Sequence, residues 1–252
     1  MDIWGLRAKL SRDELETSQI SEILGSMNLE GADLTGLDLR WATLAHLNLR
    51  GANLDHALLD GADFTDADLT DASMRWVSAR GTYFHRATLS GADMMGADLT
   101  GASFVGTDLS SADLTGVNLR GGQLYATTLR AAVLKYADLT GVDITDVCFE
   151  DADLTEVDLS CAVWGGVAPD LHSAKLDGSS LLRTNLAGAD LSGASLVGAC
   201  AVRVNLRGAC LCGADVRRAD FRHADLEGAD AHGVTWDEKT VWPFGFDVYT
   251  RI

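Results

Sequence analysis

One feature of the 252-residue chain restricts its fold more than any other: an apolar residue returns at every fifth position. From Leu29 this spacing continues through Leu34 and Leu39 to Trp164 without a miss, which gives 28 apolar centres. A strand repeats every two residues and a helix every 3.6, so neither explains the spacing. In a chain that is 47% apolar, chance would give such a run with a probability on the order of 10⁻⁹, so the period marks a true repeat.

Each five-residue unit has the same internal order. A small or β-branched residue stands two positions before the centre, and Asp or Asn often stands between them, as in Ala32-Asp33-Leu34. In an extended triplet the first and third side chains point to one side, here inward, and the middle one points outward. An outward Asp or Asn can hydrogen-bond backbone groups at a bend. Because one unit cannot bury its own apolar pair, successive coils must stack.

The aromatic residues indicate how many units close a coil. Phe64, Phe84 and Phe104 are 20 residues apart, so four units per coil would place them in one stacked column. The same register would stack Ala201 beneath Phe221.

The pattern A(D/N)LXX, over roughly residues 27–236, resembles the pentapeptide-repeat family. That resemblance implies an all-β fold, a right-handed four-sided β-helix solenoid. Counting the 14 further centres from Leu171 to Trp236, the solenoid would have about ten coils.

Both ends of a stacked solenoid expose apolar surface and need a cap. Residues 11–25 are predicted to form a short helix, with Ser11 and Glu14 as a capping box and Gly25 as its C-terminal stop. After Trp164 the period slips by two residues, which predicts either a tolerated insertion or a recognition loop. We therefore expect an N-terminal capping segment (1–26), a first repeat run (27–164), a break (165–170), a second run (171–236) and an aromatic C-terminal cap (237–252).

The formal charge of −17 is concentrated in the first run. Residues 27–164 hold 21 acidic and 8 basic residues, whereas residues 171–236 hold seven of each. With coils about 4.8 Å apart, the first run carries roughly one net charge per 2.6 Å, against one per about 1.7 Å in duplex DNA. This charge disfavours nucleic-acid binding. It predicts either that a DNA-binding partner accepts the rod in place of DNA, or that Asp belongs to the repeat and the remaining charge only confers solubility.

No catalytic constellation, phosphate-binding loop or metal-ligand spacing is present in the sequence, so we expect no enzyme activity, cofactor or metal site. Five cysteines argue against a disulfide framework. No apolar stretch approaches the roughly 20 residues of a membrane span, and no signal peptide is evident. A cytoplasmic protein without membrane association is the expectation.

Two functions are compatible with these features. Resemblance to the quinolone-resistance and topoisomerase-poison immunity members of the family implies a DNA mimic that binds a type II topoisomerase, DNA gyrase. The alternative is an interaction scaffold for another protein partner, and the oligomeric state is left open. The candidate DNA-mimicking residues are Asp60, Asp63, Asp66, Asp71, Asp146, Glu150, Asp151 and Glu156, and the candidate second contact patch is Arg75, Trp76, Arg80, Arg183 and Arg203.

Arg183 and Arg203 raise a separate question, because four units per coil would align them with His223 in one outward column. Like charges about 5 Å apart repel unless something negative satisfies them. Neighbouring aspartates are the expected partners, and an anionic binding partner is the alternative.

Overall fold

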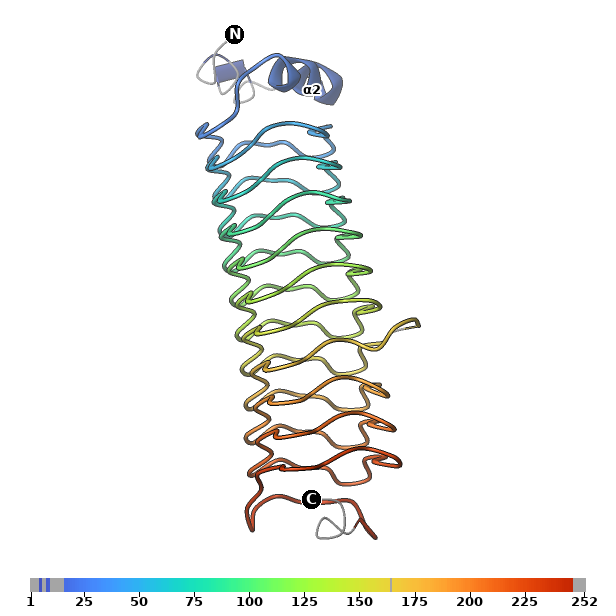
Figure 1. The fold of residues 1–252 in the computed structure, drawn as a ribbon. Helices are drawn as coiled ribbons and strands as arrows, with labels where there is room; N and C mark the ends of the chain where they lie inside the picture. Colours follow the sequence, from blue (N-terminus) through green and yellow to red (C-terminus); the bar gives the residue numbers. More distant parts are fainter. Residues whose placement is uncertain (1–4, 6–7, 10–15, 164, 247–252) are drawn as a thin grey trace.

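The computed structural model describes residue 5, residues 8–9, residues 16–163 and residues 165–246. Along most of its length the chain winds into stacked coils, with the first described residues at one end of a rod and the last described residues at the other (Figure 1). Parallel bridges join residues 20 apart, from Asp33–Asn53 through Asp143–Val163, and again from Asp170–Asp190 to Asp215–Thr235. One coil therefore takes 20 residues. Within the described residues the pairing consists of single-residue bridges, without an extended strand.

The bends between bridges have a common backbone form. The carbonyl of an apolar centre usually accepts a hydrogen bond from the amide three residues later, as from Ala62 N to Leu59 O at 2.9 Å. The intervening second residue has a positive φ, which is 67° at Gly61. Glycine adopts this conformation without a steric penalty. Asp, His, Arg and even Trp occupy the same position elsewhere, so the fold imposes left-handed geometry there whatever the side chain.

The interior is a column of the apolar centres and the small residues that precede them. Phe64, Phe84 and Phe104 are fully buried, with ring centroids 5.2 and 4.8 Å apart in a stacked arrangement. The predicted 20-residue register is thereby confirmed. Ala201 also lies one coil from Phe221, because its amide donates to the carbonyl of Asp220 at 2.9 Å.

The break in the sequence period coincides with a longer step between coils. Cys148 bridges Asp170, 22 residues on, instead of the usual 20. The extra length projects from the side of the rod (Figure 1). The amide of Val167 donates to Asp146 Oδ1 at 2.9 Å, which ties the projection to the preceding coil. Trp164 lies outside the described residues.

The N-terminal helix is shorter than predicted. Helix α2 spans Thr17–Gly25, and the amide of Glu16 donates to Gln19 Oε1 at 2.9 Å. The proposed capping residues Ser11 and Glu14 lie outside the described residues. Gly25 is the last helical residue, and Ser26 follows as C-cap with φ −91°. The helix therefore ends at Gly25 as predicted, and the chain leaves it through Ser26 without a residue of positive φ.

Both described ends of the solenoid are covered. Ile20 and Leu24 of α2 are buried in the continuous core. At the other end Trp242 stacks between Phe221 and Phe246, with centroid distances of 5.3 and 5.1 Å. Residues 247–252 lie outside the described part. No helix in the described ranges combines the length and the apolar character needed to cross a membrane.

Candidate functional site: charged surfaces of the rod

The outward aspartates of the walls have a structural role. Asp113 Oδ1 accepts a hydrogen bond from the amide of Thr115 at 2.9 Å, and Asp158 Oδ1 accepts one from Ser160 at 2.8 Å. The same hydrogen bond, from the backbone amide two residues later to the Asp or Asn side chain, recurs along both runs. The expected bonding of Asp and Asn at the bends is thereby confirmed. A carboxylate used in this way satisfies a backbone donor and still contributes negative charge to the surface.

This role gives a test at a single repeat. Asp113→Ala is expected to lower the free energy of unfolding by about 1 kcal/mol, because the amide of Thr115 loses its acceptor. Asp113→Asn retains an oxygen at the same place and is expected to stay close to the wild type. Chemical denaturation of the two variants measures the difference, and equal losses from both would show that charge matters here instead of the hydrogen bond.

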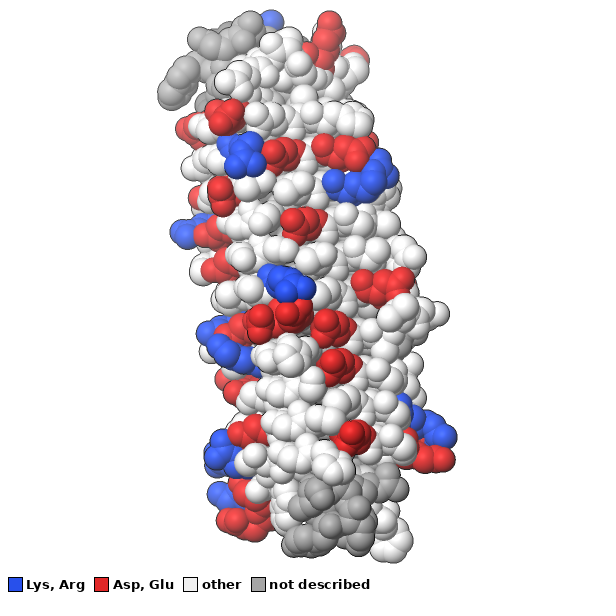
Figure 2. All heavy atoms as spheres, in the orientation of Figure 1, with Lys and Arg blue, Asp and Glu red and all other residues white. Residues whose placement is uncertain are grey.

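Every Lys and Arg side chain between residues 27 and 163 forms an ion pair with a carboxylate. Arg75 Nε lies 2.6 Å from Asp93 Oδ2, and Arg80 Nε lies 2.6 Å from Asp98 Oδ2. Arg75 and Arg80 of the predicted contact patch therefore carry compensated charges, while Trp76 beside them is 57% exposed. In Figure 2, which shows one face, basic side chains likewise lie beside acidic ones. The remaining basic residues of this run with ion pairs are Arg40, Arg50, Arg86, Arg120, Arg130 and Lys135.

Five of the eight predicted acidic residues bond within the protein. Asp60 Oδ1 accepts from the hydroxyl of Ser78 at 2.7 Å and from the amide of Arg80 at 2.9 Å. Asp66 pairs with Arg86 at 2.6 Å, and this hydrogen bond lowers the pKa of Asp66. The other three are Asp63, which accepts from the amide of Thr65, Asp146, which holds Val167, and Glu150, which pairs with Arg130.

The other three predicted acidic residues have no ion pair or hydrogen-bond partner among the described residues. Asp71, Asp151 and Glu156 all occupy the left-handed bend position, with φ of 56°, 58° and 55°, and all are exposed. Asp71 and Asp151 lie on the same edge of the rod, four coils apart, since they share the 20-residue register. These three carboxylates are therefore available to a partner.

The ion pairs predict how stability responds to acid. The hydrogen bond from Arg217 lowers the pKa of Asp215, and that from Arg222 lowers the pKa of Asp220. An unfolded Asp has a pKa of about 3.9. Because the native pKa is lower, the stabilisation is complete above the unfolded value and is lost as pH falls through the native value. We expect the midpoint temperature of thermal unfolding to decrease as the pH is lowered below about 4. A midpoint temperature that rises on acidification would instead show that repulsion among carboxylates dominates.

Arg183 and Arg203 differ from the cations of the first run. Neither guanidinium makes an ion pair or a hydrogen bond to any described residue, so the expectation that neighbouring aspartates satisfy them is wrong. The two arginines lie on successive coils, because the amide of Arg183 donates to Val202 O at 3.1 Å. They lie about five and six coils from Arg80. The predicted second contact patch is therefore divided along the rod.

The sequence did not predict one cluster of side chains that could hold a metal ion. Ligand atoms of Cys148, Glu150 and Asp170 lie within 4.8 Å of one another. The 22-residue step across the break brings Asp170 beside Cys148, and no regular spacing of ligand residues signals this. Glu150 is already paired with Arg130, and Asp170 accepts a hydrogen bond from the amide of His172.

The chain belongs to the pentapeptide-repeat family. The family model "Pentapeptide repeats" matches segments 24–61, 48–86, 82–121, 123–160, 170–201 and 202–235. Among solved structures the chain is similar to HetL of the cyanobacterium Nostoc sp. strain PCC 7120, a pentapeptide repeat protein involved in heterocyst differentiation regulation. Identity is 31%, the match covers 90% of this chain and 97% of HetL, and the TM-score is 0.56.

A second similar structure is the plasmid-mediated fluoroquinolone resistance protein QnrB1. It is 19% identical over 76% of this chain and 92% of QnrB1, with a TM-score of 0.32. Rfr23 of the cyanobacterium Cyanothece 51142 is 24% identical over 60% of this chain and 90% of Rfr23, with a TM-score of 0.22. No curated protein matches the chain.

Proposed function

We propose that this protein is a rod of about ten right-handed, four-sided coils that acts without catalysis by binding another protein. Bridges every five residues and a 20-residue register support four sides per coil. The described coils carry polar, charged and some aromatic side chains outward over a continuous apolar core, which suits a rigid rod that binds a partner through its surface.

We propose further that the first seven coils mimic DNA for a type II topoisomerase, DNA gyrase, and so protect it from topoisomerase poisons. The observation that carries this proposal is the net charge of −13 in residues 27–164, obtained from 21 acidic and 8 basic residues. Since all eight basic side chains are already paired with carboxylates, none of them is left to neutralise Asp71, Asp151 and Glu156. A basic DNA-binding groove would therefore meet a straight anionic rod. The proposal assigns the protein to the cytoplasm.

The test is a supercoiling assay with purified DNA gyrase, with and without a fluoroquinolone, at two salt concentrations. We expect inhibition or drug protection that weakens at the higher salt, because the binding is electrostatic. No effect at micromolar protein would reject DNA mimicry and leave the alternative, an interaction scaffold with a different protein partner.

The residues to change are the three unpaired carboxylates. Asp71→Asn/Asp151→Asn/Glu156→Gln removes three charges without breaking a described hydrogen bond, and we expect at least about a tenfold loss of inhibition, or about 1.4 kcal/mol. Replacing Asp60 and Asp66 would also remove the contacts to Ser78 and Arg86, so a loss there would be ambiguous. The control is Glu22→Gln/Glu238→Gln, which removes charge from exposed carboxylates outside the first run that make no hydrogen bond or ion pair with a described residue. An equal loss per charge removed from the two variants would mean that only total charge matters.

A further inference from the structure

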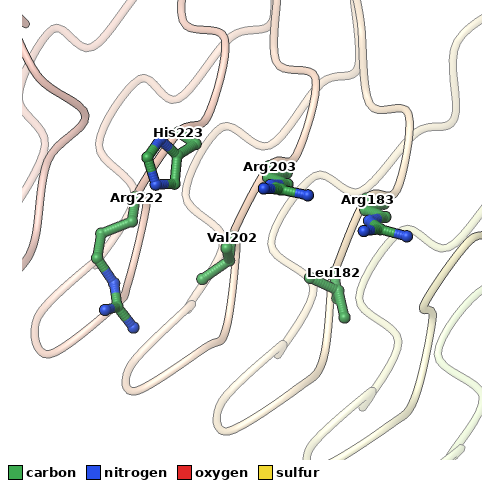
Figure 3. Close-up of a pocket in the computed structure, with 6 residues that line it drawn as sticks. All are labelled: Leu182, Arg183, Val202, Arg203, Arg222 and His223. Atoms are coloured by element: carbon green, nitrogen blue, oxygen red, sulfur yellow. The ribbon is translucent and has the colours of Figure 1, made fainter.

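A shallow groove runs along one edge of the second repeat run. It has a volume of about 300 Å³ and lies on three successive coils. Figure 3 shows Arg183 and Arg203 extending side by side in the same direction, with Arg222 and His223 on the next coil. Its lining residues are Leu182, Arg183, Val202, Arg203, Arg222 and His223.

The two central arginines are not required by the fold. They occupy the left-handed bend position, with φ of 58° and 59°, where glycine would be free of strain. The same edge carries glycine on five successive coils of the first run, from Gly61 to Gly141. Two stacked cations without a described carboxylate partner repel each other. Their charge is therefore available to an external anionic group.

The groove also has an apolar row. Leu182 and Val202 directly precede the two arginines in sequence, and Leu182 is 37% exposed. The third coil carries Arg222, which pairs with Asp220 at 2.6 Å. The surface is thus amphipathic, with apolar and basic rows parallel to the axis of the rod. A simple inorganic anion would use only the basic row.

The spacing of the rows favours one kind of occupant. Coils repeat at about 4.8 Å along the axis. In an α-helix laid along that axis, residues i+3, i+4 and i+7 lie about 4.5, 6.0 and 10.5 Å from residue i, close to one or two coil steps. In an extended strand, side chains on one face repeat at about 6.7 Å, which falls out of step with the coils.

We propose that this groove binds an acidic amphipathic helix of a partner protein. Carboxylates on one side of the helix pair with Arg183 and Arg203, and apolar residues beside them cover Leu182 and Val202. The phosphate backbone of a nucleic acid would pair with the basic row and leave the apolar row uncovered, whereas one face of an amphipathic helix matches both rows. The site is distinct from the acidic surface of the first run, and it rests on the proposed function only in so far as both involve a protein partner.

The probe is a synthetic 14-residue helical peptide with a row of Glu at i, i+3, i+7 and an adjacent row of Leu, labelled with fluorescein. Fluorescence anisotropy with the full-length protein is expected to give micromolar affinity. Arg183→Gln/Arg203→Gln should weaken binding at least about tenfold, and so should Leu182→Ser/Val202→Ser. The matched control, Arg207→Gln/Arg217→Gln, removes the same charge from arginines that are paired with carboxylates, and it should stay within about twofold.

Two further measurements separate the outcomes. Circular dichroism of Arg183→Gln/Arg203→Gln should show an unfolding midpoint no lower than the wild type, since a repulsive pair is removed; binding lost together with the fold would reject a specific site. Three results would each overturn the proposal. They are no peptide binding at 1 mM protein, equal affinity of the peptide for Arg183→Gln/Arg203→Gln and for the control Arg207→Gln/Arg217→Gln, and tighter binding of a single-stranded oligonucleotide than of the peptide. The Asp71→Asn/Asp151→Asn/Glu156→Gln protein should keep peptide binding, so failure here and failure of DNA mimicry are distinguishable.

Discussion

Phe84→Ala is expected to lower the free energy of unfolding by about 3–5 kcal/mol, the range found when a buried aromatic residue is truncated. Phe84 is fully buried and lies between Phe64 and Phe104 at centroid distances of 5.2 and 4.8 Å. Its removal opens a cavity inside the column and ends both stacking contacts. The cavity cannot close easily, because backbone hydrogen bonds to the coils above and below fix the spacing.

The control for this prediction is the adjacent residue. Tyr83→Ala removes an aromatic ring that is 48% exposed and is expected to cost less than about 1 kcal/mol. Urea denaturation followed by circular dichroism measures both variants. A repeat rod unfolds partly as a sum of neighbouring units, so hydrogen exchange at the coils of Phe64 and Phe104 should show the loss most strongly. Equal stability of the two variants would contradict a close-packed aromatic column.

The core could be predicted from the sequence because it depends on local spacing alone. Five residues per unit and phenylalanines at 64, 84 and 104 already determine which side chains stack. The N-terminal helix was predicted well at its end, where Gly25 is the last helical residue. Its start was predicted less well, because Glu16 has an extended backbone that is held by Gln19, so α2 begins at Thr17 and not at residue 11.

The charged surfaces depend on contacts that cross from one coil to the next. Arg75 reaches Asp93, 18 residues on, a pairing that follows from the coil length and the reach of the side chain. Arg183 and Arg203 lack such partners although the second run holds as many acidic as basic residues. Composition therefore indicated the charge of each run, but it could not tell compensated cations from available ones.

Trp76 and Gly96 provide the second large expected effect. The indole of Trp76 lies over Gly96 of the next coil, and a Cβ added to Gly96 would overlap the six-membered part of the ring. Gly96 also has φ 67°, where a side chain costs about 1–2 kcal/mol. Gly96→Ala is therefore expected to cost about 2–3 kcal/mol, since it adds displacement of the indole to the backbone strain.

Gly101 separates these two causes. It has nearly the same φ, 68°, but an added Cβ would meet no atom within 4 Å, so Gly101→Ala should show the backbone strain alone. In a Trp76→Ala background the cost of Gly96→Ala should fall to that of Gly101→Ala. This double-mutant cycle isolates the ring contact, and a coupling energy near zero would mean that the indole does not rest on Gly96 in solution. A clear coupling energy would mean that the contact with Gly96 fixes the exposed indole of Trp76 in one position. The outer face of the indole could then contact a partner with little further loss of side-chain conformational entropy.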